Sequence, residues 1–70
     1  MTPAEALREQ GQELLKLSTE TGRAYAEHNR GRSPERPPRR PDLRVWADAY
    51  EASGWMLFRR ALELEKEEKD

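Results

Sequence analysis

The chain has 70 residues, of which 39% are charged and 34% hydrophobic, and it contains no cysteine. This length allows one small domain at most, and the lack of cysteine excludes disulfide bonds and thiolate metal sites. The longest apolar run, Trp55–Phe58, is far shorter than the roughly 20 residues of a transmembrane helix, so we expect no membrane association. The N-terminus lacks the basic start and apolar stretch of a secretory signal, and we expect a cytoplasmic protein.

Charge is unevenly distributed, although its formal sum is only −1. Residues 1–29 hold three basic and five acidic side chains. Residues 30–44 hold six basic and two acidic ones, and residues 45–70 hold four basic and seven acidic ones. A basic centre therefore separates two acidic arms. Arginine outnumbers lysine by ten to three and isoleucine is absent, a composition that we interpret as a sign of bacterial or phage origin.

The first predicted helix covers about residues 3–29. Thr2 is a suitable N-cap, Pro3 suits the first helical position, and Glu5 completes a capping box. At 100° per residue the leucines and Tyr25 fall on one face, whereas most charged residues fall on the other. Gly31 supplies the left-handed residue that commonly ends a helix.

Two glycines interrupt this first helix on its apolar face, with Ser18 between them. Gly11 and Gly22 each cost about 1 kcal/mol relative to alanine, so their presence calls for a reason. One interpretation is a small-residue groove that admits a partner backbone or ring, and the other is a break in the helix near residues 18–22. The amphipathic phase continues across both glycines, which favours the groove.

The second predicted helix covers about residues 42–68 and follows a Pro/Arg-rich loop at about 30–41. Pro41 disfavours helix at the preceding residue and can open the next helix. The loop is longer than the 2–8 residues typical between packed helices. Around Gly54–Phe58 the second helix is apolar on nearly every side, and Trp46 and Trp55 lie on opposite sides of it because they are nine residues apart.

These elements predict an all-α fold, an antiparallel two-helix hairpin that forms a single domain over residues 1–70. The predicted register pairs Leu14 with Leu57 and Ser18 with Gly54. A lone hairpin of this size buries too little surface to offset the ordering of its chain, so we expect self-association into a four-helix bundle, as a homodimer or with helices from another protein. The residues predicted to form the association interface are Trp46, Trp55, Met56, Phe58 and Leu62.

No constellation of residues predicts catalysis, a cofactor or a metal site. His28 is the only histidine, and a metal site needs three or four converging ligands. The serines have no base at an obvious partner position, and the four glycines are too scattered for a phosphate-binding loop. We therefore expect a protein that is not an enzyme, with His28 near the end of its helix or at the rim of the core.

The basic centre carries the most distinctive polar side chains. Arginine binds phosphate through two parallel hydrogen bonds, and the neighbouring prolines hold the backbone extended. Against a nucleic-acid site, no aromatic residue is interleaved to stack on bases, which favours a solvated linker whose arginines pair with nearby acids. The candidate phosphate- or partner-binding residues are Arg30, Arg32, Arg36, Arg39, Arg40 and Arg44.

The function we expect is that of a small interaction or regulatory protein acting through helical-bundle association. The alternative is a nucleic-acid-binding accessory protein that uses the arginines of residues 30–44.

Overall fold

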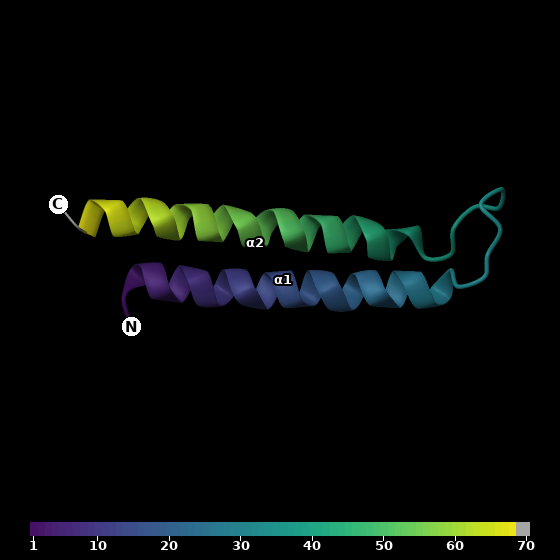
Figure 1. The fold of residues 1–70 in the computed structure, drawn as a ribbon, viewed down its shortest axis with the longest axis horizontal. Coiled ribbons are helices and arrows are strands. Elements are labelled where there is room, and N and C mark those ends of the chain that lie inside the picture. Colours follow the sequence, from purple (N-terminus) through teal and green to yellow (C-terminus); the bar gives the residue numbers. More distant parts are fainter. Residues whose placement is uncertain (69–70) are drawn as a thin grey trace.

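The protein is an antiparallel hairpin of two long helices, described over residues 1–68 by a computed structural model (Figure 1). Helix α1 spans Pro3–His28 and helix α2 spans Pro41–Glu68. The two helices pack along their length into a rod of 55 × 18 × 14 Å, with the start of α1 and the end of α2 at one end and the loop at the other. The predicted all-α hairpin is confirmed, and the predicted helix ends are correct to within one residue.

Local sequence explains where α1 begins and ends. The Thr2 hydroxyl accepts a hydrogen bond of 3.1 Å from the backbone N–H of Glu5, and Pro3 occupies the first turn, where no N–H is needed. Asn29 caps the other end, because its N–H reaches the carbonyls of Tyr25 and Ala26. Gly31 does adopt a left-handed backbone with φ 72°, but it lies within the loop rather than directly after the helix.

The contact between the helices is built from small residues. Ala4, Gly11 and Ser18 recur every seven residues on α1, and Ala47, Gly54 and Ala61 do so on α2; we call these six residues the small-residue seam. A repeat of seven returns to nearly the same side of a helix, so each set faces the partner helix along its length. Ala4 and Ala61 are 1% and 0% exposed, whereas no large side chain among the described residues is fully buried.

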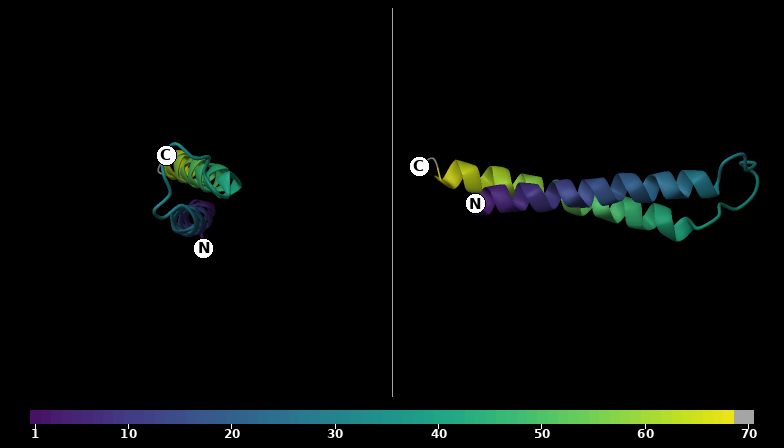
Figure 2. Two further views of the ribbon diagram at one scale, coloured as in Figure 1. Left: turned by 90° about the vertical axis from the view of Figure 1, so that its right-hand side faces the viewer. Right: turned by 90° about the horizontal axis from the view of Figure 1, so that it is seen from below.

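Gly11 and Gly54 bring the two backbones into direct contact. A Cβ atom on Gly11 would lie 3.0 Å from the carbonyl oxygen of Gly54, and a Cβ atom on Gly54 would lie 3.0 Å from that of Gly11. The helices also cross, so that α2 passes from one side of α1 to the other along the rod (Figure 2). Close approach at a crossing requires residues without side chains at the point of contact.

The small-residue groove predicted on α1 is present at Gly11 and Ser18 but not at Gly22. A Cβ atom on Gly22 would meet nothing within 4 Å. The alternative of a helix break is wrong, because α1 is continuous through this segment.

The predicted register is wrong for Ser18. Its hydroxyl donates a hydrogen bond of 2.8 Å to the carbonyl of Ala47, seven residues before Gly54, and Gly54 faces Gly11 instead. The predicted register aligns large residues of one helix with large residues of the other, and it misplaces the small residues. The observed register instead depends on which residues let the two backbones approach closely. Leu14 and Leu57, the other predicted pair, both line one groove on the hairpin surface.

Candidate functional site

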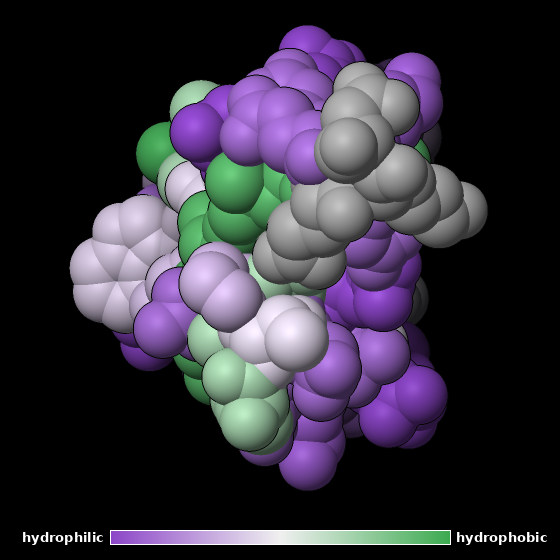
Figure 3. Space-filling view, turned by 90° about the vertical axis from the view of Figure 1, so that its left-hand side faces the viewer, coloured by the Kyte–Doolittle hydropathy of each residue, from purple (hydrophilic) through white to green (hydrophobic). Residues whose placement is uncertain are grey.

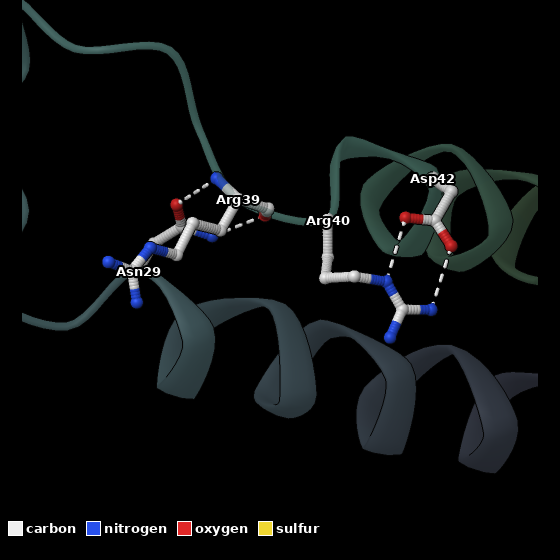
Figure 4. Close-up of polar contacts among 4 residues, drawn as sticks. All are labelled: Asn29, Arg39, Arg40 and Asp42. Atoms are coloured by element: carbon white, nitrogen blue, oxygen red, sulfur yellow. Dashed lines mark hydrogen bonds and ion pairs between the residues drawn. The ribbon is translucent and has the colours of Figure 1, made fainter.

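Asn29 and Arg39 close the loop that joins the two helices. The side-chain amide of Asn29 donates to the carbonyl of Arg39 at 2.9 Å and accepts from its N–H at 2.7 Å (Figure 4). The same amide nitrogen donates to the carbonyl of Tyr25 at 2.8 Å, within the last turn of α1. One side chain therefore fixes the far end of the loop to the end of the helix.

The interior of the loop is also held by hydrogen bonds. Arg32 Nε donates to the carbonyl of Pro37 at 2.8 Å, and the N–H of Arg36 donates to the carbonyl of Ser33 at 3.1 Å, which forms a turn. The Ser33 hydroxyl accepts from the N–H of Glu35 at 3.3 Å. Prolines at 34, 37 and 38 fix φ at three further points. A loop of this length is thus confined to a narrow range of conformations.

A polar cavity of about 350 Å³ opens on this loop. Its lining includes four arginines and no acidic residue. We call it the loop cavity, and its lining residues are His28, Arg30, Gly31, Arg32, Ser33, Arg36 and Arg39. The structure therefore brings together four of the six arginines singled out from the sequence.

Nearby acids neutralise the arginines of the loop cavity only in part. Arg30 forms an ion pair of 2.9 Å with Glu27, one turn earlier on α1. Within residues 1–68 the ion pairs do not include Arg32, Arg36 or Arg39. Three guanidinium groups around one cavity therefore lack a carboxylate partner in the described part of the chain.

Arg40 and Arg44 do not line the loop cavity. The Arg40 side chain turns toward α2, where its Nε and Nη2 atoms donate to the two carboxylate oxygens of Asp42 at 3.1 and 2.9 Å (Figure 4). This hydrogen-bonded pair raises the pKa of the Arg40 guanidinium and lowers the pKa of the Asp42 carboxyl. Arg40 also has a left-handed backbone, with φ 51°, directly before Pro41. Arg40 thus lies directly before α2 and pairs with its first turn, and Arg44 is an exposed residue of that helix.

Sequence reasoning did not assign His28 and Ser33 to this site. His28 is the last residue of α1, and Ser33 begins the turn that ends at Arg36. Their positions next to Arg30 and Arg32 in the chain were the available signal, but which side chains share a cavity depends on the path of the loop.

Large apolar side chains are exposed along α2. The exposed fraction is 54% for Trp46, 57% for Trp55, 68% for Met56 and 56% for Leu62. Phe58, the fifth residue of the predicted interface, is instead half-buried and would be 3.1 Å from a Cβ atom on Gly11. Val45 is 64% exposed and was not among the residues singled out.

Three of these residues form one continuous surface. Trp55 and Phe58 pack with ring centroids 5.7 Å apart and an interplanar angle of 44°. Leu62 lies one turn beyond Phe58, and the spacing of three and four residues places all three on one flank of α2. We call Trp55, Phe58 and Leu62 the aromatic stripe.

The opposite flank carries a shallow apolar groove of about 570 Å³ between the two helices. Its apolar lining residues are Met1, Ala6, Leu14 and Leu57, and its polar ones are Glu9, Gln10 and Glu13. Viewed from the end of the rod where α1 begins and α2 ends, hydrophobic side chains form an interrupted band down the middle of the surface, with strongly hydrophilic ones above it, below it and along one side (Figure 3). The hairpin therefore presents apolar surface on both flanks of the small-residue seam.

Comparisons with protein-family models, curated proteins and solved structures gave no match to this chain. Among residues 1–68, no three His, Asp or Glu side chains are grouped so that they would hold a metal ion. Neither helix, over the same residues, has the length and apolar character needed to cross a membrane.

Proposed function

We propose that this chain is a small non-enzymatic interaction protein that pairs with a second copy of itself to form a four-helix bundle. The observation that supports this function is the contrast between the small-residue seam and the exposed residues around it. The hairpin buries alanine and glycine in its own contact and leaves two tryptophans more than half exposed.

The energetics of folding favour covering these residues. Ordering the backbone costs about 1–2 kcal/mol of free energy per residue, and burial of alanine or glycine offsets only a small part of this cost. Fully burying one large apolar side chain contributes about 1.5–3 kcal/mol. A second layer of helices over Trp55, Phe58 and Leu62 would add this contribution several times over.

The aromatic stripe suits a second copy as its partner. An isologous dimer places the same patch of each copy against the other, so one exposed stripe per chain is sufficient. Two copies with a formal charge of −1 each repel one another only weakly. Helices of 26 and 28 residues also give the hairpin two arms of nearly equal length, as a symmetric bundle requires.

Sedimentation equilibrium on matched variants tests this function. Trp55→Ala and Leu62→Ala each remove apolar surface from the aromatic stripe, and we expect each to weaken dimerisation by about tenfold or more. Val45→Ala is the control, because Val45 is exposed but lies on the side of α2 opposite the seam. Self-association through the stripe would be contradicted if all three variants changed the dimerisation constant equally. It would also be contradicted if the chain stayed monomeric alone and formed a heavier complex only with an unrelated protein.

A further inference from the structure

We propose that the loop cavity binds a compact phosphate chain, such as tripolyphosphate or the triphosphate of a nucleotide. This inference is independent of self-association, because the cavity is formed by residues 28–39 of one chain.

The charge of the cavity selects an anion. Arg32, Arg36 and Arg39 line it without a carboxylate partner among residues 1–68, and Arg30 adds a fourth guanidinium. Guanidinium groups donate paired hydrogen bonds that match the oxygen spacing of phosphate. The Ser33 hydroxyl and the His28 imidazole add further polar groups to the lining. Uncompensated charge around a concave surface therefore favours a ligand with several negative charges.

The loop is held in shape before any ligand arrives. The paired hydrogen bonds between Asn29 and Arg39 close its base, and the bond from Arg32 to Pro37 spans its interior. Binding to an ordered loop requires less loss of conformational freedom than binding to a mobile one. The bond to Pro37 uses Nε of Arg32, which leaves the two terminal nitrogens of that guanidinium to donate to a ligand.

Size and surroundings favour a compact phosphate chain over a nucleic acid. A volume of about 350 Å³ lies in the range of small-molecule sites, about 300–1,000 Å³. Binding to a duplex spreads contacts over many phosphates, whereas here four arginines line one small cavity in the loop at one end of the rod. The chain on either side is acidic, with five acids against three bases in residues 1–29 and seven against four in residues 45–70. No tryptophan, tyrosine or phenylalanine lines the cavity, which leaves the small His28 imidazole as the one ring there that could stack on a base.

Isothermal titration calorimetry on the full chain tests the site, with tripolyphosphate, ATP and a short DNA duplex as probes at about 150 mM salt. We expect tripolyphosphate to bind, and the double variant Arg36→Gln/Arg39→Gln to lose at least about tenfold in affinity. The matched control is Arg59→Gln/Arg60→Gln, which removes the same charge from the far half of α2 and leaves the cavity intact. Its affinity is expected to stay within about twofold of the original, because distant sites act independently. Circular dichroism verifies that both double variants remain helical.

The comparison of probes assigns the source of the phosphate chain. Tighter binding of ATP than of tripolyphosphate supports a nucleotide, and equal or weaker binding of ATP supports an inorganic chain. The proposal is overturned if neither probe binds, if both double variants lose affinity equally, or if the duplex binds more tightly than tripolyphosphate.

Discussion

Three helical glycines in this protein differ in what surrounds them. Gly11 and Gly54 face each other across the helix contact, and an added Cβ atom at either would lie 3.0 Å from a carbonyl oxygen of the partner helix. Gly22 faces open space. The first two glycines are therefore required by packing, whereas the third only weakens its helix.

This difference predicts opposite effects of alanine at Gly54 and Gly22. At Gly54 the new methyl group would lie 2.9 Å from Leu15 Cγ, and we expect overpacking to lower the free energy of unfolding by about 1–3 kcal/mol. At Gly22 we expect a gain of about 0.5–1 kcal/mol from helix propensity alone. Urea denaturation of both variants measures the two effects. Stabilisation by Gly54→Ala would contradict the close contact of the backbones.

The ion pair at the start of α2 predicts a pH dependence. The hydrogen bond from Arg40 lowers the pKa of Asp42 below its ordinary value of 3.8. A carboxyl whose pKa is lower in the folded state stabilises the fold above its unfolded pKa, and that contribution is lost as the pH falls through the folded value. We expect Arg40→Gln to raise the titration midpoint of Asp42, as measured by carboxyl carbon NMR. An unchanged midpoint would show that the pair does not form in solution.

At the scale of elements, the helices and the loop were predictable and the register was not. Thr2, Pro3 and Pro41 mark helix starts through chemistry local to the sequence. The register depends on how closely two backbones approach, and helical phase alone ranks Leu14 and Gly11 together on one face. The sequence signal for the small-residue seam is a small residue at every seventh position. This signal becomes evident only when the same repeat is found in both helices.

The loop also gives a prediction at this scale. Asn29→Ala removes the Oδ1 atom that accepts the Arg39 N–H at 2.7 Å, so we expect faster hydrogen exchange at that amide. Thr19→Ala is the control, because Thr19 Oγ1 donates to the carbonyl of Leu15 within α1 and has no contact with the loop. Hydrogen-exchange rates of the Arg39 amide, measured by NMR in the two variants, test whether Asn29 holds the loop closed. Equal rates at Arg39 in both variants would mean that Asn29 does not hold the loop closed.

For the whole molecule, the sequence predicted which residues are distinctive but not how they divide among sites. Six arginines form one predicted site because they are close in sequence, yet Arg40 turns toward Asp42 and only four line the loop cavity. The predicted interface of α2 likewise includes Phe58, which the fold half-buries against Gly11. Both divisions arise from the fold in three dimensions, which a pattern along one helix does not contain.

We propose that this hairpin completes its hydrophobic core with a second copy. Light scattering combined with thermal melting over a range of protein concentrations tests this self-association most directly. We expect a species of about 16 kDa, twice the 8.2 kDa of one chain, with a melting temperature that rises with protein concentration because association stabilises the folded state. A cooperatively melting monomer of 8.2 kDa, with a melting temperature independent of concentration, would contradict it.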